Sequence, residues 1–82
     1  MTKEINEKEL RKELIGLYEN YSKDKDIKSE AKKLFLEYST AENFLNKETY
    51  DAIMKLEGMG WDLRNKTTIE EAKEILKKLE ND

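Results

Sequence analysis

The sequence predicts an all-α fold, a small antiparallel (up-down) helical bundle whose default form has four helices. Apolar residues recur at steps of three and four along most of the chain, which is the spacing of a single helix face. No segment alternates apolar and polar residues as a strand does. The polar turns between the apolar stripes are short, so sequence neighbours should pack antiparallel. A three-helix variant follows if the last helix docks only loosely.

The first helix is predicted over residues 7–22. Asn6, with Glu9 three residues later, has the pattern of a helix N-terminus. The expected inner face combines steps of four, three and four: Leu10, Leu14, Leu17 and Tyr21. Gly16 inside this helix costs roughly 1 kcal/mol relative to alanine. Close approach of a neighbouring helix would explain it, and neutral drift is the alternative.

The second helix is predicted over residues 27–44. Its stripe is the longest in the chain and holds Ile27, Ala31, Leu34, Tyr38, Ala41 and Leu45. Asp26 is the expected cap at its start. Ser39 and Thr40 weaken its middle, because their hydroxyls compete for backbone hydrogen bonds. A break at these two residues is therefore the alternative.

The third helix is predicted over residues 47–64, with Asn46 as its N-cap, and the fourth over residues 69–80. The third carries a stripe at steps of four, three and four: Ala52, Leu56, Met59 and Leu63. Thr68 with Glu71 forms a capping box at the start of the fourth. All four helices are assigned to one domain, residues 1–82.

The stretch EGMGWDL, residues 57–63, allows three interpretations. Gly58 can end the third helix as a left-handed cap. The unbroken apolar spacing instead favours a helix that continues through Gly58 and Gly60, at a cost of roughly 1 kcal/mol for each glycine. Trp61, with Met59, can also form a contact patch, because such side chains are enriched at interfaces. Whether Trp61 is a core anchor or an interface residue stays open.

Composition excludes several classes of protein. The chain has 16 basic and 19 acidic residues, a net charge of −3 and a pI near 5.1. Because the charges are interspersed and no basic cluster exists, direct nucleic-acid binding is not expected. The longest apolar runs are three residues, so neither membrane insertion nor a secretory signal is expected. A cytoplasmic protein is the simplest prediction.

The residues needed for most enzyme chemistry are missing. The sequence has no histidine and no cysteine, which removes the usual general base, the thiolate nucleophile and the common zinc ligands. No glycine-rich phosphate loop occurs. The sequence therefore predicts a protein that is not an enzyme and holds no cofactor and no metal.

Binding to a protein partner is the function that remains. Seven aromatic residues are more than the helix stripes can bury, so some should lie at the surface. The predicted partner-binding positions, expected to be exposed, are Tyr18, Phe44, Tyr50, Met59 and Trp61.

Segment order and local patterns resemble the pediocin-like (class IIa) bacteriocin immunity proteins. Residues 14–18 (LIGLY) match the type of first helix found there, and residues 33–38 (KLFLEY) match the Leu/Tyr stripe of the second. A polar turn and a long third helix follow, and residues 69–79 resemble the fourth. The resemblance implies a cytosolic four-helix bundle without catalytic residues. It also implies that the protein guards its producer cell by binding a membrane receptor already engaged by the toxin.

Two other kinds of binder fit the same sequence. One is a phage or mobile-element protein that inhibits a host enzyme or a defence nuclease, which a one-sided acidic face would favour. The other is a helical assembly module that forms a homo-oligomer through the stripe of residues 27–45. Concentration-dependent helicity would identify this second case.

Overall fold

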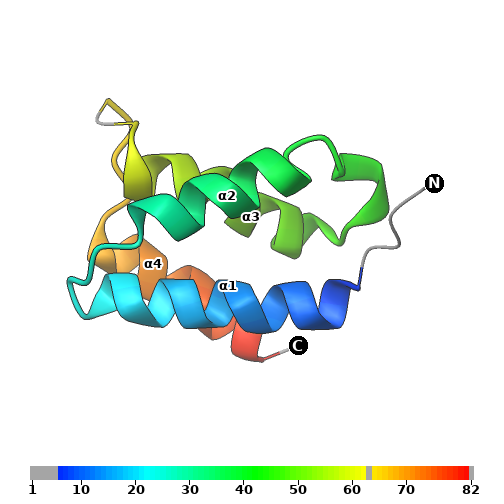
Figure 1. Cartoon of the computed structure of the whole chain (residues 1–82). Helices are drawn as coiled ribbons and strands as arrows, with labels where there is room; N and C mark the ends of the chain where they lie inside the picture. The colour runs from blue at the N-terminus through cyan, green and yellow to red at the C-terminus, as the bar shows by residue number, and fades with distance from the viewer. Residues whose placement is uncertain (1–5, 63, 82) are drawn as a thin grey trace.

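The computed structural model describes residues 6–62 and 64–81, and these residues form an all-α bundle without strands. The predicted fold class is confirmed. Four α-helices and one 3₁₀ turn follow each other along the chain: α1 (Glu7–Ser22), α2 (Lys28–Tyr38), η1 (Glu42–Phe44), α3 (Lys47–Gly60) and α4 (Ile69–Glu80). Successive helices run in alternating directions (Figure 1).

Local capping sets the ends of α1 and α4, which span the residues predicted for the first and fourth helices. The Asn6 side chain accepts a hydrogen bond from the backbone N–H of Glu9 at 3.3 Å. Thr68 Oγ1 accepts one from the N–H of Glu71 at 3.1 Å. Each bond satisfies an N–H that the helix leaves unpaired at its N-terminus.

The second predicted helix is two elements, so the prediction of one helix over residues 27–44 is wrong. Helix α2 ends at Tyr38, and η1 follows after the turn at Ser39 and Thr40. The Ser39 carbonyl accepts a hydrogen bond from the Tyr50 hydroxyl of α3 at 2.8 Å instead of continuing the helix. Ala41 beyond the break is still buried, which explains why the apolar stripe continued through it.

The third helix ends earlier than residue 64. Both Gly58 and Gly60 lie inside α3, and neither takes a positive φ, so the interpretation of Gly58 as a left-handed cap is wrong. The helix ends after Gly60, where the N–H groups of Trp61 and Asp62 both bond to the Glu57 carbonyl, at 3.1 and 2.8 Å. Leu63, the predicted last member of the stripe, lies outside the described residues.

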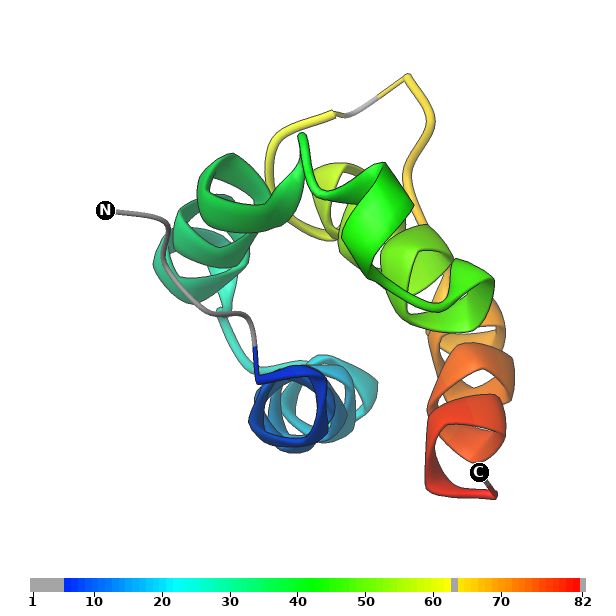
Figure 2. The same ribbon diagram turned by 90° about the vertical axis from the view of Figure 1, so that its right-hand side faces the viewer.

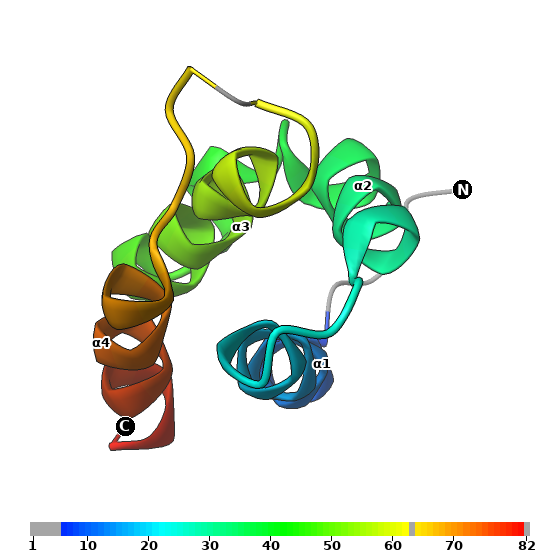
Figure 3. The ribbon, with the colours of Figure 1, turned by 90° about the vertical axis from the view of Figure 1, so that its left-hand side faces the viewer.

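The helices form an arc rather than a square bundle. Viewed from either end, α2, α3 and α4 follow one another and α1 lies across the open side of the arc (Figures 2 and 3). Helix α2 packs chiefly on α3, and α1 packs chiefly on α4. Although α1 and α2 are joined by a short turn, they are not one of the closely packed pairs.

Hydrogen bonds at two places along α1 tie it to α3. Tyr18 is fully buried, and its hydroxyl donates a hydrogen bond of 2.6 Å to the Ala52 carbonyl. At the start of α1, the Glu7 carboxylate accepts hydrogen bonds from Asn46 and from the buried Thr49 hydroxyl at 3.0–3.2 Å. Asn46 occupies the predicted N-cap position, but its side chain bonds to Glu7 and makes no capping bond.

Candidate protein-binding surfaces

Gly58 is a packing notch for the loop that connects α3 to α4. A Cβ atom at Gly58 would collide with the Asn65 carbonyl oxygen, and it would lie 2.5 Å from Thr67 Oγ1 and 2.8 Å from Thr67 N. Backbone contacts this short exclude any side chain. The fold therefore accounts for this glycine completely.

Thr67 joins the same loop to α3 and α1 through hydrogen bonds. Its N–H donates to the Gly58 carbonyl at 2.9 Å, and its Oγ1 donates to the Lys55 carbonyl at 3.2 Å. Its own carbonyl accepts a hydrogen bond of 2.5 Å from the Tyr21 hydroxyl of α1. Thr67 is only 2% exposed, so all three bonds stabilise a buried junction.

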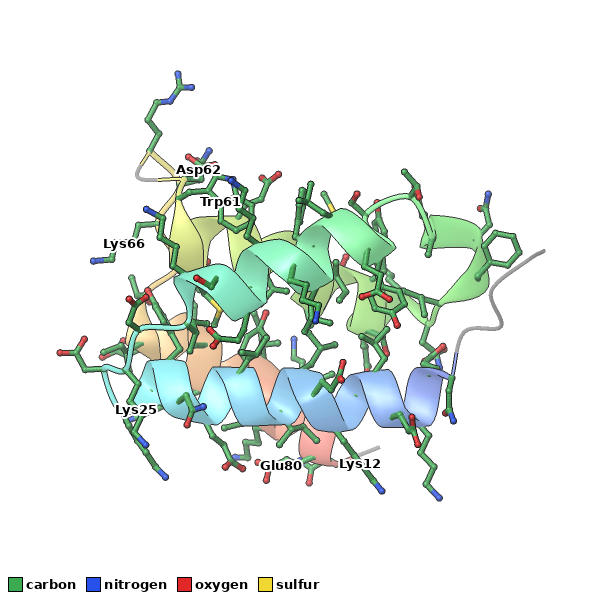
Figure 4. The ribbon with its side chains drawn as sticks, in the orientation of Figure 1. Lys12, Lys25, Trp61, Asp62, Lys66 and Glu80 are labelled. Carbon is green, nitrogen blue, oxygen red and sulfur yellow. The ribbon has the colours of Figure 1, made fainter. Side chains whose placement is uncertain are left out.

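Trp61 is half-buried and belongs partly to the packing and partly to the surface. Its ring meets Phe35 of α2 edge to face, with centroids 5.5 Å apart and an interplanar angle of 74°. Such pairs stabilise beyond their buried area. Figure 4 shows Trp61 and Asp62 together at the end of α3, where they also line a shallow hollow with Glu57 and Arg64.

The other predicted contact residues divide between interior and surface. Tyr18 and Met59 are buried, so their expected exposure is wrong. Met59 belongs to the inner stripe of α3, and Tyr18 follows Leu14 by four residues, so helical spacing already placed both inside. Tyr50 is half-buried, with its hydroxyl on the Ser39 carbonyl. Phe44 is 74% exposed, as expected.

Leu36 is an exposed residue that the sequence reasoning missed. It is 67% exposed on α2. The sequence did indicate this exposure, because Leu36 is not a member of the apolar stripe and lies about 200° round the helix from Leu34. With Phe44 it makes two strongly exposed apolar side chains, each on a different element, and single exposed apolar residues are ordinary.

A groove of about 720 Å³ lies between α1 and α2. The α1 wall follows one helix face at steps of three, one and three: Glu13, Gly16, Leu17 and Asn20. The α2 wall repeats the pattern one residue longer: Glu30, Lys33, Leu34, Glu37 and Tyr38. Two helix faces that would pack together in a closed bundle here leave a channel between them.

The groove has an apolar base and a polar rim. Leu17 and Leu34 are 8% and 7% exposed, so they form the outer edge of the hydrophobic core. Tyr38 is half-buried and also packs on the core. The rim carries three glutamates against one lysine. The groove therefore offers an apolar strip between mainly acidic edges.

Gly16 stands in the α1 wall of this groove with no contact of its own. An added Cβ would find no other atom within 4 Å. Its φ is not positive, so no special backbone conformation requires glycine. The explanation that a neighbouring helix approaches closely is therefore wrong within this fold. Gly16 leaves α1 backbone bare at the surface of the groove.

Two other hollows lie at contacts between helices of the fold. One lies where α1 meets α4, with Lys12 and Glu80 at its edge (Figure 4), and Arg11 there donates a hydrogen bond to the Leu79 carbonyl at 3.4 Å. Another, of about 290 Å³, lies between α3 and α4 beside Met54 and Ile75. Neither hollow contains a glycine that the fold leaves unexplained, and neither has a rim whose charges are mainly of one sign.

The described residues contain no group of three or more carboxylates placed to hold a metal ion. Burial raises the pKa of Tyr18 above its ordinary value of 10.0. The pKa of Tyr21 is also raised, first by desolvation and then by the negative charges of Asp24 and Glu71. Both hydroxyls stay protonated at neutral pH and act as hydrogen-bond donors in the fold.

Among the described helices, none combines the length and the apolar character that crossing a bilayer requires. Comparisons with protein-family models, with curated proteins and with solved structures found no match to this chain.

Proposed function

We propose that this chain is a non-catalytic protein-binding module and that the α1–α2 groove is its contact surface. The observation that carries the proposal is Gly16. A glycine in mid-helix costs about 0.5–1 kcal/mol relative to alanine, and nothing in the fold requires it. A partner that approaches the bare backbone of α1 supplies the missing reason.

Within this class, the proposed role is that of a bacteriocin immunity protein acting in the cytoplasm of the producer cell. The resemblance in helix order supports it, and an all-α bundle is the fold that the resemblance implies. Fold alone does not specify function, since helical bundles serve many roles. The role therefore needs a test in cells.

The test is to produce the chain in a bacterium sensitive to pediocin-like bacteriocins and to measure survival against those toxins. Protection relative to the empty vector is the expected result. Gly16→Leu, which fills the groove, should abolish protection. Lys73→Leu is the matched control, because it adds the same side chain at an exposed position of α4 outside every hollow described above. Equal survival with and without the wild-type chain would overturn the immunity role.

An inhibitor of a host enzyme or a defence nuclease is the second candidate. The specific observation in its favour is the rim of three glutamates, which complements a basic surface. The assembly module loses support, because Ile27 and Ala31 of its stripe are only 3% and 0% exposed. These two side chains are already used by this chain's own core.

A further inference from the structure

The α1–α2 groove has the dimensions of a short helix. Helix α2 has 11 residues and so is about 16 Å long, which matches roughly three turns of a partner helix. Each wall presents one helix face, at the spacing that lets another helix pack ridges into grooves. Strand addition is the main alternative mode, but it needs a sheet edge, and the part of the chain described here has no strand.

Gly16 favours a helical occupant that comes close to α1. A small residue at a helix–helix contact lets the two backbones approach, because no Cβ separates them. The neighbouring Leu17 and the opposing Leu34 then supply apolar contact on both sides of an inserted side chain. An apolar stripe along the occupant would cover this base.

The rim determines the charge of the occupant. Glu13 on α1 faces the groove from one side, and Glu30 and Glu37 face it from the other, with Lys33 as the one basic rim residue. An apolar stripe flanked by lysine or arginine is complementary to this arrangement. An acidic occupant would place like charges against the glutamates. A second copy bound through the same groove would do so too, and an anionic membrane would be repelled.

We propose that the groove binds an amphipathic helix of a partner protein whose apolar stripe is flanked by basic residues. This inference rests on the proposed function, since it specifies the partner of the same surface. It differs in what it claims: the proposed function concerns a biological role, whereas this inference concerns the chemistry of the occupant.

The experiment uses two synthetic 14-residue helical peptides with the same leucine stripe, one flanked by lysine and arginine and the other by glutamate. Affinity for the full chain is measured by fluorescence anisotropy at two salt concentrations. The basic peptide should bind, with an affinity that falls as salt rises. The acidic peptide should bind at least about ten-fold more weakly. No binding of the basic peptide at 1 mM, or equal binding of both, would overturn the proposal.

Variants locate the binding on the groove. Gly16→Leu should weaken the basic peptide at least about ten-fold, because its side chain occupies the space that the occupant needs. Glu13→Lys with Glu30→Lys should weaken it by a similar factor. The matched charge control is Glu70→Lys with Glu74→Lys, two exposed positions on α4, and it should leave the affinity within about three-fold. Equal losses of affinity in the groove pair and in the control pair would show a general electrostatic attraction. That result would overturn the assignment of peptide binding to the groove.

Two further measurements separate the alternatives. Sedimentation of the free chain should show no self-association that the groove variants abolish, and vesicles rich in anionic lipid should not bind it. A positive result in either would assign the groove to a second copy or to a membrane instead. Protection of cells without peptide binding would refute this inference and leave the proposed role. Peptide binding without protection of cells would refute the proposed role and leave this inference.

Discussion

Two glycines on the two sides of this bundle have opposite environments. Gly58 lies where the α3–α4 loop crosses helix α3, and a Cβ there would strike the Asn65 carbonyl and both N and Oγ1 of Thr67. Gly16 lies in the α1–α2 groove, where a Cβ would meet nothing within 4 Å. Folding therefore explains Gly58 and leaves Gly16 unexplained. A residue that costs stability without serving the fold is a candidate for function, and this difference directs attention to the groove.

The strongest test of the comparison is Gly58→Ala. The new Cβ overlaps backbone atoms of the loop, which cannot rotate away as a flexible side chain can, so the loop must shift and its buried hydrogen bonds weaken. We expect a loss of about 2–3 kcal/mol in the free energy of unfolding, measured by urea denaturation.

Gly60→Ala is the matched control for this experiment, two residues further along the same helix. Its Cβ would lie 3.8 Å from Lys28 and 3.9 Å from Ala31, which is ordinary contact. Stability should stay unchanged or rise slightly. A tolerated Gly58→Ala would mean that the loop does not pack on α3 as described.

Local sequence predicted the extents of α1 and α4 because their signals are local. Capping by Asn6 and Thr68 involves atoms three residues apart, and such bonds can be read from spacing alone. The break after Tyr38 depends on a hydroxyl from another helix, Tyr50, so Ser39 and Thr40 indicated only that a break was an alternative. Long-range partners decide these boundaries.

The candidate site was predicted less well than the fold. Tyr18 was expected at the surface, although it follows the inward-facing Leu14 by four residues; it is buried, and its hydroxyl bonds to the Ala52 carbonyl, 34 residues away. Gly16 was recognised as unusual from its position in a helix, yet what it faces depends on α1 packing against α4 rather than α2. No pattern within α1 specifies that choice of neighbour.

High pH offers a second test, this time of the buried contact that Tyr18 of α1 makes with α3. Burial raises the pKa of Tyr18 above 10.0, so in the fold it keeps a proton that the unfolded chain loses above about pH 10. Stability from this group is fully present below pH 10. It should then fall by up to about 1.4 kcal/mol per pH unit as pH rises further, while Tyr18 stays protonated in the fold.

Urea unfolding of the wild type and of Tyr18→Phe between pH 7 and pH 11.5 measures this effect. At pH 7 the free energy of unfolding of the variant should be lower by about 1 kcal/mol, because the hydrogen bond to the Ala52 carbonyl is lost. Its stability should decline less steeply above pH 10. Parallel slopes for the two proteins would show that Tyr18 ionises in the fold as easily as in the unfolded chain.

Thr67→Val tests the packing of the α3–α4 loop by removing one hydrogen bond and little else. Valine keeps the shape of threonine, and the backbone bonds of residue 67 to Gly58 and Tyr21 remain. Only the Oγ1 bond to the Lys55 carbonyl is lost, so we expect a loss of about 1 kcal/mol, measured by thermal unfolding. Thr40→Val, at an exposed turn position, is the control and should change stability by less than half as much.

Gly16→Ala has the smallest expected effect on stability and the opposite sign. Because the Cβ enters open space and alanine is the best helix former, the free energy of unfolding should rise by about 0.5–1 kcal/mol, measured by urea denaturation. The same methyl group would separate α1 from a helix lying in the groove, so affinity for the basic peptide should fall while stability rises. A gain in stability with full affinity would show that the glycine does not serve binding. A loss of stability would show that Gly16 is needed by the fold after all, and the contrast with Gly58 would no longer hold.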